Sequence, residues 1–434
     1  MVARFEAPML LLSLFASPAV AFCGTFVSVG DDAPTNEGSQ IAIVRQNGMT
    51  TLTMANDVHG SLADFAMVIP IPEILAETAL HVVDPAIMDH IAGYSGARLV
   101  SYQCSDFEQR EDEADSDTDV DYDYGDTGDT DTTVEAQYIV GEYDIVILSS
   151  VESGSLVGWL QDNGYNVPSE SQSLLGEYID SGSYFLAAQV REDAGLADGA
   201  TLSPLQLTYT DAAGTLPIRL GTLNSTGQQD LTIFGITDVD AGALAISNYP
   251  EAEVETDCML PEGVALGDHV DGVLDAALPL TGEAQWVTEY AFQNGSCDPC
   301  SPDGSVSAED LESLGFDPDY HYGYTYMFTR LHLRYAPEQI TQDLVLYESG
   351  LTEQRQLRYI EYNLQMEDRF ETCGLGMVDA PGSCEDDDGE PWGAGDTDER
   401  ALAGTGCGCE SAGAPAAGLI LLAAAMARRR RDAV

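Results

Sequence analysis

Apolar residues along the middle of the chain recur mostly with the two-residue period of β-strands, and turn residues separate the runs. Between two early runs stands Asn47-Gly48, a typical hairpin turn. The predicted strands are 40–45, 49–54, 65–71, 138–151, 184–191, 205–209, 216–223, 231–236, 285–292, 327–335 and 343–347.

Apolar spacings of three or four residues predict only a few helices. The helical patterns cover 74–91, with an interruption near Pro85, and then 156–160 and 172–179. One more helix is predicted to begin at Ser307, which caps it together with Asp310 at the third helical position. Because strands occur in clusters with helices grouped between them, we predict an α+β, strand-rich ectodomain of two packed subdomains.

The N-terminus has the layout of a secretory signal peptide. Arg4 precedes an apolar stretch over 9–16, Pro18 ends that stretch, and Ala-Val-Ala at 19–21 completes the small-residue cleavage pattern. Cleavage after Ala21 would leave a mature chain that starts at Phe22. The sequence therefore predicts an exported protein.

The C-terminus, 407–434, joins Cys407 and Cys409 to an apolar run over 412–427 and an arginine cluster over 428–431. Arginines after such a run place that end in the cytoplasm and the bulk of the chain outside. The arrangement resembles the MYXO-CTERM sorting tail, which implies processing near one of the two cysteines and attachment at the cell envelope. The alternative is a plain transmembrane anchor. Its helix would be about 24 Å long, against a hydrocarbon core of roughly 30 Å.

The charge balance excludes two classes of partner. Asp and Glu number 74 against 16 basic residues, every basic residue is arginine, and the formal net charge is −58. Nucleic acid and anionic lipid both require a positive face, so neither is predicted as a partner of the folded part.

Two acidic, low-complexity stretches divide the chain. Neither has the apolar residues to bury itself, so both are predicted to be disordered, one as an insertion and one as a stalk. The predicted organisation is a signal peptide (1–21), the first part of the ectodomain (22–104), the acidic insertion (105–133), the rest of the ectodomain (134–384), the acidic stalk (385–406) and the sorting tail (407–434).

Several motifs between the two ends occur in one order. They are Cys-Gly at 23–24, DFAMVIPIP at 64–72, LVGWLQDNGYNVP at 156–168, YFLA at 184–187, CDPC at 297–300 and TRLHLRY at 329–335. Together they resemble the bacterial domain-of-unknown-function family number 2330 over 22–375. The resemblance implies an exported, often membrane-tethered protein and brings no established activity or catalytic residues.

The cysteines before the tail are scattered rather than clustered like metal ligands, and an oxidising compartment favours disulfides among them. Their pairing stays open. Cys297-Asp-Pro-Cys300 is predicted to be structural; the alternatives are a redox pair or a zinc site that would recruit His321. The disulfide candidates are Cys23, Cys258, Cys297, Cys300, Cys373 and Cys384.

The acidic insertion raises the question of calcium. Asp119, Asp121 and Asp123 fit the first three ligand positions of an EF-hand loop, but Tyr124 stands at its glycine position and Thr130 at its glutamate position. We therefore predict a solvated spacer, with weak calcium binding by these aspartates as the alternative. No other cofactor is predicted.

The chain shows no recognisable catalytic motif. Ser95 lies in a sequence like a nucleophile elbow that lacks the closing glycine. His332 alternates with Leu331 and Leu333, so it is predicted to face outward beside Arg330 and Arg334. The alternating tyrosines could stack sugars, although such spacing is more typical of a half-buried sheet face; they are Tyr320, Tyr322, Tyr324 and Tyr326.

The leading hypothesis is an exported, envelope-anchored, non-catalytic binding, adhesion or structural protein. Its predicted partners are the envelope membrane, through the tail, and the export and tail-processing machinery; the sequence does not identify an extracellular ligand. Two alternatives are a calcium-dependent adhesin and an exported enzyme whose site is assembled from distant residues. A pocket that gathers titratable groups with shifted pKa values would favour the enzyme.

Overall fold

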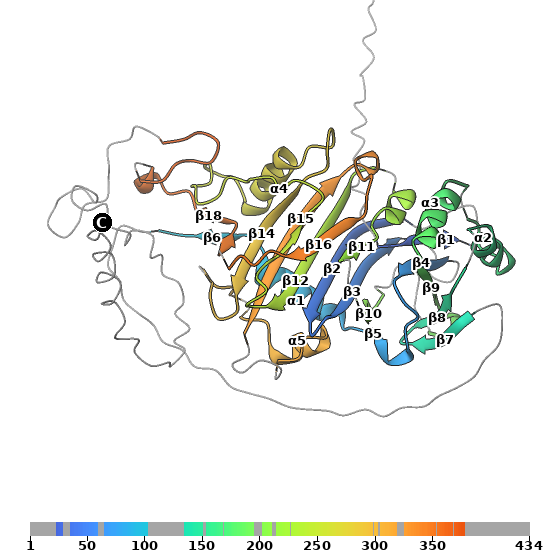
Figure 1. The fold of residues 1–434 in the computed structure, drawn as a ribbon. Coiled ribbons are helices and arrows are strands. Elements are labelled where there is room, and N and C mark those ends of the chain that lie inside the picture. The colour runs from blue at the N-terminus through green and yellow to red at the C-terminus, as the bar shows by residue number, and fades with distance from the viewer. Residues whose placement is uncertain are drawn as a thin grey trace, which may run out of the picture.

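Two large β-sheets form the body of the molecule (Figure 1). The computed structural model describes residues 23–28, 35–59, 65–102, 134–150, 153–167, 169–194, 202–210, 214–225, 227–297, 299–302, 304–318, 325–352, 354–367 and 369–377. Neighbouring strands in both large sheets are antiparallel, except that β12 and β2 are parallel.

The larger sheet has eight strands and the smaller one five. In the first, the spatial order is β17 (Arg355–Gln356), β14 (Trp286–Gln293), β15 (Tyr326–Tyr335), β12 (Gln229–Asp238), β2 (Thr35–Gln46), β3 (Met49–His59), β10 (Leu205–Thr210) and β5 (Leu80–Val82). In the second, it is β1 (Thr25–Ser28), β4 (Phe65–Ile71), β9 (Tyr184–Val190), β8 (Tyr143–Leu148) and β7 (Val134–Val140).

Two small sheets complete the described strands. One contains β11 (Thr215–Leu216), β16 (Leu344–Glu348) and β13 (Leu244–Ile246). The other is a parallel pair, β18 (Arg358–Ile360) with β6 (Arg98–Val100). Short 3₁₀ helices are η2 (Glu77–Ala79), η3 (Glu192–Ala194), η4 (Leu220–Asn224), η5 (Pro337–Gln339) and η6 (Leu364–Met366).

The main core lies between the two large sheets. One face of each sheet supplies it, because successive side chains of a strand point to opposite faces. Fully buried members from both sheets are Ile43, Leu52, Ile145, Leu186, Ile233 and Leu331.

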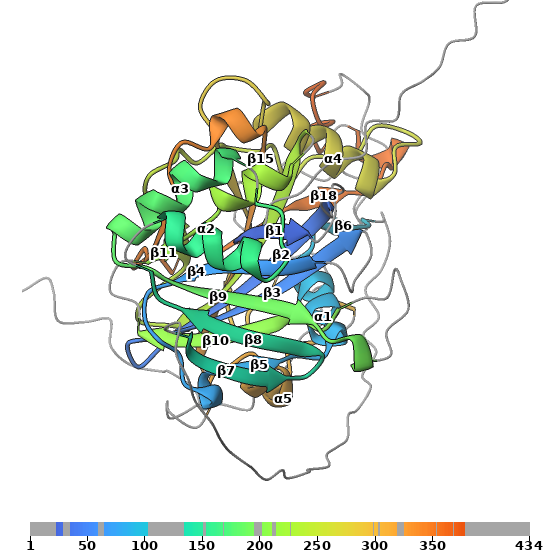
Figure 2. The ribbon, with the colours of Figure 1, turned by 90° about the vertical axis from the view of Figure 1, so that its right-hand side faces the viewer.

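Helices cover the outer faces of both sheets. The helices α2 (Ser153–Asp162) and α3 (Ser169–Asp180) pack on the five-stranded sheet (Figure 2). On the eight-stranded sheet, α1 (Pro85–Ser95) and α5 (Ala308–Ser313) pack at one end, and α4 (Leu266–Ala277) packs against β14 further along. The predicted strand-rich α+β class is therefore confirmed.

Several local predictions are confirmed. Asn47 and Gly48 both have positive φ, 57° and 75°, as the predicted hairpin turn between β2 and β3 requires. The helix α5 begins after Ser307, whose side chain accepts from Asp310 N while the Asp310 carboxylate accepts from Ser307 N. This is the predicted capping box.

Other local predictions are wrong because turns interrupt the patterns. The first half of the predicted helix 74–91 contains η2 and β5, and α1 begins only at Pro85, where the Asp84 side chain caps it. The predicted strand 138–151 is a hairpin of β7 and β8 that turns at Gly141, whose φ is 56°. Only the start of 216–223 is a strand, since η4 follows. The helix α4 was not predicted.

The predicted signal peptide, acidic insertion, stalk and sorting tail all lie outside the described residues. Within the part of the chain that the structure describes, no helix combines the length and the apolar character that a membrane span needs.

Candidate functional site

The outer face of β12, β14 and β15 changes from aromatic to charged along its length. On β15, Tyr326 and Phe328 supply aromatic side chains to this face, and Arg330, His332 and Arg334 continue it with charged side chains. We call the cluster of Tyr94, Phe234, Tyr290, Tyr326 and Phe328 the aromatic end. This cluster packs with residues of α1 and α5.

The other end of this face holds a network of ion pairs, which we call the ionic end. The ring of His332 spans two carboxylates: Nδ1 lies 2.7 Å from Glu289 Oε1, and Nε2 lies 2.8 Å from Asp230 Oδ1. Arg330 Nε lies 3.0 Å from Glu289 Oε2. Arg334 Nε donates to Asp230 Oδ1 over 2.7 Å.

Two helices complete the ionic end from above the sheet. Arg330 Nη1 donates to the carbonyl oxygen of Ala92 in α1 over 3.0 Å. Arg334 Nη1 donates to Asp275 Oδ1 in α4 over 2.6 Å. The guanidinium of Arg330 also lies 5.7 Å from the centroid of the Phe234 ring, where the ionic and aromatic ends meet.

A β-bulge positions Glu289. Thr288 pairs with Leu331 and Tyr290 pairs with Arg330, so Glu289 is an extra residue of β14 between two successive partners on β15. A bulge bends its strand and redirects the side chain of the extra residue. The carboxylate thereby reaches both Arg330 and His332 from one position.

The network fixes the charges of its members. Burial alone would raise the pKa of Glu289, but the charge of Arg330 and the hydrogen bond from His332 lower it to about 2. Burial would lower the pKa of His332, yet its hydrogen bonds to Asp230 and Glu289 raise that pKa above its usual value. The pKa of Asp230 is lowered, because its bonds to His332 and Arg334 outweigh burial.

Both ring nitrogens of His332 face carboxylate oxygens, which only accept hydrogen bonds, so the geometry favours a ring that is protonated at both nitrogens. Its predicted strand alternation is confirmed, since Leu331 and Leu333 lie in the core between the sheets. Its predicted outward position is wrong in one respect: the residue is only 8% exposed, because side chains and helices cover this face. With both nitrogens engaged, His332 has no lone pair for a general base.

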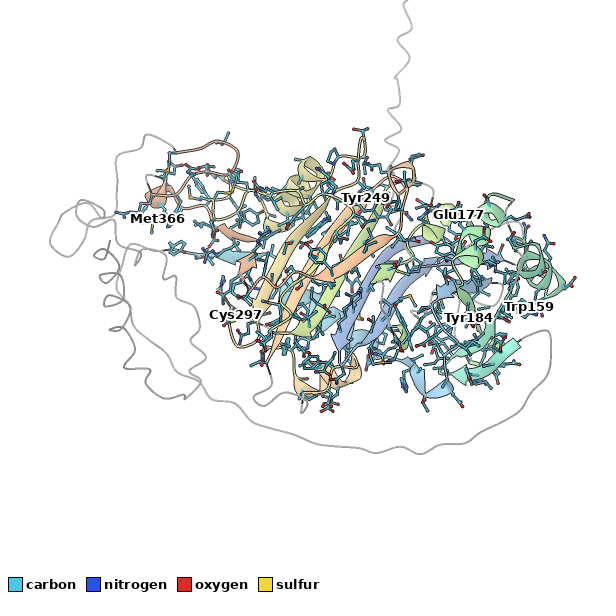
Figure 3. All side chains as sticks on the ribbon, viewed as in Figure 1. Trp159, Glu177, Tyr184, Tyr249, Cys297 and Met366 are labelled. Carbon is cyan, nitrogen blue, oxygen red and sulfur yellow. A yellow bond between two sulfur atoms is a disulfide. The ribbon has the colours of Figure 1, made fainter. Side chains whose placement is uncertain are left out.

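A disulfide joins distant parts of the C-terminal region. Cys258 and Cys373 are linked, 115 residues apart in sequence, and both are buried. They pack with Leu260, Leu357 and Tyr359 in a small apolar cluster beside β18. In Figure 3 this part of the molecule, marked by Met366, lies on the opposite side from Trp159 of α2.

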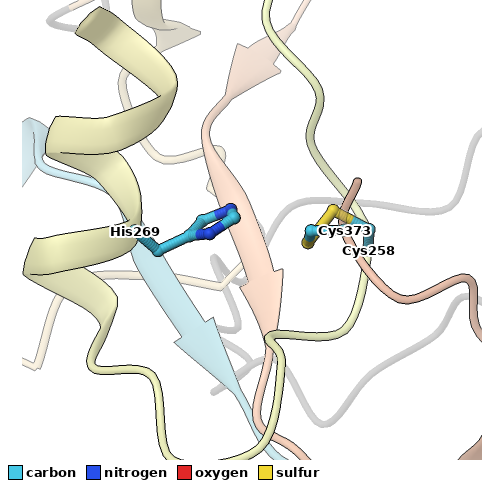
Figure 4. Close-up of side chains that lie close together, drawn as sticks. All are labelled: Cys258, His269 and Cys373. Carbon is cyan, nitrogen blue, oxygen red and sulfur yellow. A yellow bond between two sulfur atoms is a disulfide. The ribbon is translucent and has the colours of Figure 1, made fainter. Parts of the chain in front are cut away.

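His269 of α4 lies next to this disulfide (Figure 4). A ring nitrogen of His269 and the two sulfur atoms all lie within 4.8 Å of one another. The ring stands edge-on to Tyr359, with centroids 4.6 Å apart. Burial lowers the pKa of His269, and the charge of Glu255 opposes that effect.

Cys297 and Cys300 form a second disulfide in the loop after β14. Four of the six candidate cysteines are thus paired in the structure. The prediction of Cys23 as a disulfide candidate is wrong, because Cys23 is a free, fully buried thiol in the core between the sheets. Burial there raises the pKa of Cys23, and the nearby charge of Asp343 raises it further.

Asp343 belongs to a second polar group, which is partly buried. Its carboxylate accepts from the Tyr178 hydroxyl over 2.8 Å and from the backbone N–H of Arg219 over 3.0 Å. Burial raises the pKa of Asp343. The same contacts tie α3, η4 and the strand β16 together, which is a structural role.

A hollow of about 580 Å³ lies where the β2–β3 turn meets β16. Its lining includes Arg45, Met49, Asp238, Tyr347 and Glu348. Met49 and Tyr347 are 39% and 45% exposed, so the hollow offers apolar as well as charged surface. Glu289, His332 and Asp343, whose pKa values are shifted, do not line it.

Two of the predicted candidates are buried, and the others named here lie outside the described residues. Ser95 is buried in the last turn of α1 and donates to Ile91 O over 2.7 Å. Tyr326 is buried at the aromatic end. Outside the described residues lie Ala21, Asp119, Asp121, Asp123, Tyr320, His321, Tyr322, Tyr324, Cys384, Cys407 and Cys409.

Three residues of these sites were not predicted from the sequence: Asp230, Glu289 and His269. Glu289 carried a usable signal, because it stands among apolar residues in a predicted strand, and a glutamate is almost never fully buried without a partner. Asp230 at the start of its strand and His269 in an unpredicted helix carried no comparable signal.

A family model described as "Uncharacterized protein conserved in bacteria (DUF2330)" matches residues 17–347. No curated protein matches the sequence, and no solved structure matches the chain.

Proposed function

This chain belongs to the family of uncharacterized proteins conserved in bacteria, DUF2330, and on that premise we propose that it is an exported, envelope-anchored, non-catalytic binding, adhesion or structural module. The observation that carries the proposal is the disulfide between Cys258 and Cys373, which closes a long loop inside a buried cluster. Disulfides of this kind persist in oxidising compartments outside the cytoplasm.

The ionic end supports the non-catalytic part of the proposal. His332, Glu289 and Asp230 have the shifted pKa values that often mark active sites, but each is bound to neighbours in the network. Catalysis needs a group that is free to exchange a proton with a substrate. A network of this kind suits a rigid scaffold better than an active site.

The hollow beside the β2–β3 turn supports the binding part. It combines the guanidinium of Arg45 with the exposed side chains of Met49 and Tyr347. Ligand sites commonly combine apolar surface with a few polar groups in this way.

The experiment that tests export is mass analysis of the protein from its native envelope fraction. We expect a chain that begins at Phe22 and lacks the arginines of 428–431. A full-length cytoplasmic product would refute export, and an exported chain with intact arginines would refute only the processing of the tail.

Peptide mapping without reductant tests the disulfides in the same material. We expect one cross-linked pair of peptides from Cys258 and Cys373 and an oxidised pair at Cys297 and Cys300. Free alkylation of both pairs without reductant would contradict an oxidising compartment.

The calcium-dependent adhesin makes a different prediction for the acidic insertion. Deletion of 106–131 should leave the effect of calcium on the melting temperature unchanged if this stretch is a spacer. A calcium-dependent rise in the full chain that is absent from the deletion variant would favour the adhesin, because a ligand bound only to the native state stabilises it.

A further inference from the structure

We propose that Cys258, His269 and Cys373 form a redox-gated binding site for a thiophilic divalent cation of the zinc type. In the oxidised chain the two cysteines form a disulfide; after reduction, their thiolates and the imidazole supply three ligands. This site lies outside the network of His332 and goes beyond the proposed function.

The geometry of the three side chains carries the proposal. Their donor atoms, Sγ of each cysteine and one ring nitrogen of His269, all lie within 4.8 Å of one another. Zinc–sulfur bonds of about 2.3 Å and zinc–nitrogen bonds of about 2.0 Å place the ligand atoms of one tetrahedral ion roughly 3.5–4 Å apart. Opening the disulfide separates the sulfur atoms toward that spacing.

The orientation of His269 is a second, independent observation. Its Nε2 is buried and has no hydrogen-bond partner. Such an unpaired buried nitrogen costs free energy, and a ligand that accepts its lone pair removes that cost. The edge contact with Tyr359 holds the ring in place, and Figure 4 shows the ring projecting from α4 toward the two sulfur atoms.

Glu255 contacts the segment that follows Cys373. Glu255 Oε2 accepts from the backbone N–H of Gly374, next to Cys373, over 2.9 Å. The Tyr359 hydroxyl donates to the backbone oxygen of Glu255 over 3.0 Å. Three protein ligands leave a fourth position for water, and the carboxylate of Glu255 adds negative charge near a bound cation.

The donor set selects the class of metal. Two thiolates and an imidazole suit zinc and its substitutes cobalt and cadmium, whereas calcium and magnesium require oxygen ligands. The acidic character of the chain therefore does not decide binding at this site.

The gate is a two-electron reduction. A dithiol reductant transfers two electrons to the Cys258–Cys373 bond, which becomes two thiols while the reductant becomes a disulfide. Binding of one divalent cation then releases two protons, one from each thiol, because thiolates are the ligands. The disulfide and the metal complex thus exclude each other.

The test uses the full chain, oxidised or reduced with a phosphine, which converts the disulfide and one water into two thiols and a phosphine oxide. Cobalt is added first and then displaced with zinc. We expect a near-ultraviolet thiolate-to-cobalt band with tetrahedral visible bands in the reduced protein, one cobalt per chain at this site, and none at this site in the oxidised protein. An identical titration for both forms would overturn the proposal.

Variants assign the site. Cys258→Ser with Cys373→Ser retains Cys297 and Cys300 and should lose the cobalt bands; retention of the bands in this folded variant would overturn the proposal. Reduced protein that unfolds and is not restored by zinc would also overturn it.

His269→Ala keeps the disulfide and tests the third ligand without removing a cysteine. Loss of a direct ligand should weaken zinc binding by at least the ~10–100-fold that loss of an outer-shell partner costs. His81→Ala, which changes an exposed histidine at β5, is the matched control and should leave affinity unchanged. Equal affinity for His269→Ala and the unaltered chain would refute a three-ligand site.

Discussion

The aromatic end and the ionic end lie on one continuous face of the same three strands, yet they stabilise the fold by different physics. The aromatic end gains from apolar area, so a substitution there costs in proportion to the area and volume lost. The ionic end places three cations against three carboxylates, counting Arg330, His332, Arg334, Asp230, Glu289 and Asp275. Removal of the buried Glu289 there leaves His332, also buried, without one of its partners.

This difference implies that stability depends on side-chain volume at the aromatic end and on the pairing of every buried charge at the ionic end. A conservative change of shape should be tolerated on the apolar part of the face, and a conservative change of charge should not be tolerated at the buried Glu289.

Glu289→Ala should lower the free energy of unfolding by about 3–5 kcal/mol. The change removes the shared partner of the buried His332 and the partly buried Arg330. Urea unfolding followed by circular dichroism measures the loss. Glu251→Ala is the matched control at the half-exposed pair with Arg355 and should cost less than about 1 kcal/mol. Equal losses for the two variants would contradict the role of burial.

Glu289→Gln tests charge without a change of shape. The amide keeps the volume but cannot neutralise two buried cations, so we expect a loss of about 1.5–3 kcal/mol, as for a hydrogen bond to a charged group. Ile236→Leu on the apolar part of the same face should cost less than about 1.5 kcal/mol, because it conserves volume. A larger loss for Ile236→Leu than for Glu289→Gln in the same unfolding assay would reverse the contrast.

The ionic end should also make stability depend on pH at both limits. The pKa of Glu289 is about 2 in the fold against an ordinary value of 4.5, so its contribution is present above about pH 4.5 and is lost as the pH falls toward about 2. The pKa of His332 is raised above 6.5, so its contribution is complete below pH 6.5 and is lost as the pH rises through the raised value.

The unfolding free energy of the unaltered chain and of His332→Gln, measured across this range, checks the sign. The variant should lose the part of the alkaline decline that His332 causes. An unchanged alkaline decline would show that His332 is not charged in the fold.

Asp275→Ala should have the smallest effect, at most about 1 kcal/mol. The Asp275 side chain is 66% exposed, and Arg334 keeps its bond to Asp230. High salt should reduce even this effect, because solvent-exposed charges are screened. A loss as large as that of Glu289→Ala would show that α4 is essential to the network.

Local residues were sufficient to predict features with local causes. Asn47 and Gly48 define the β2–β3 turn through their positive φ angles, and Ser307 with Asp310 starts α5. The alternation of β15 correctly separated Leu331 and Leu333 from His332. The helix predicted at 74–91 was wrong because Asp84 and Pro85 start α1 only there, after a strand that pairs with β10.

The candidate sites depended on residues far apart in the chain. Glu289, Asp230 and His332 belong to three strands, and only their register brings the two carboxylates to opposite nitrogens of one ring. Cys258 meets Cys373 across 115 residues, with His269 contributed by a helix that the apolar pattern did not reveal.

By itself, the sequence determined the family, the strand-rich class, the charge balance and the turns that punctuate the strands. These follow from composition and from residues a few positions apart. Only the tertiary structure decided that His332 is buried between two carboxylates, that Cys23 is a free thiol, and which cysteines pair. Burial, and the identity of the group opposite, are properties of strand pairing and helix packing, so they exist only once distant segments have been brought together.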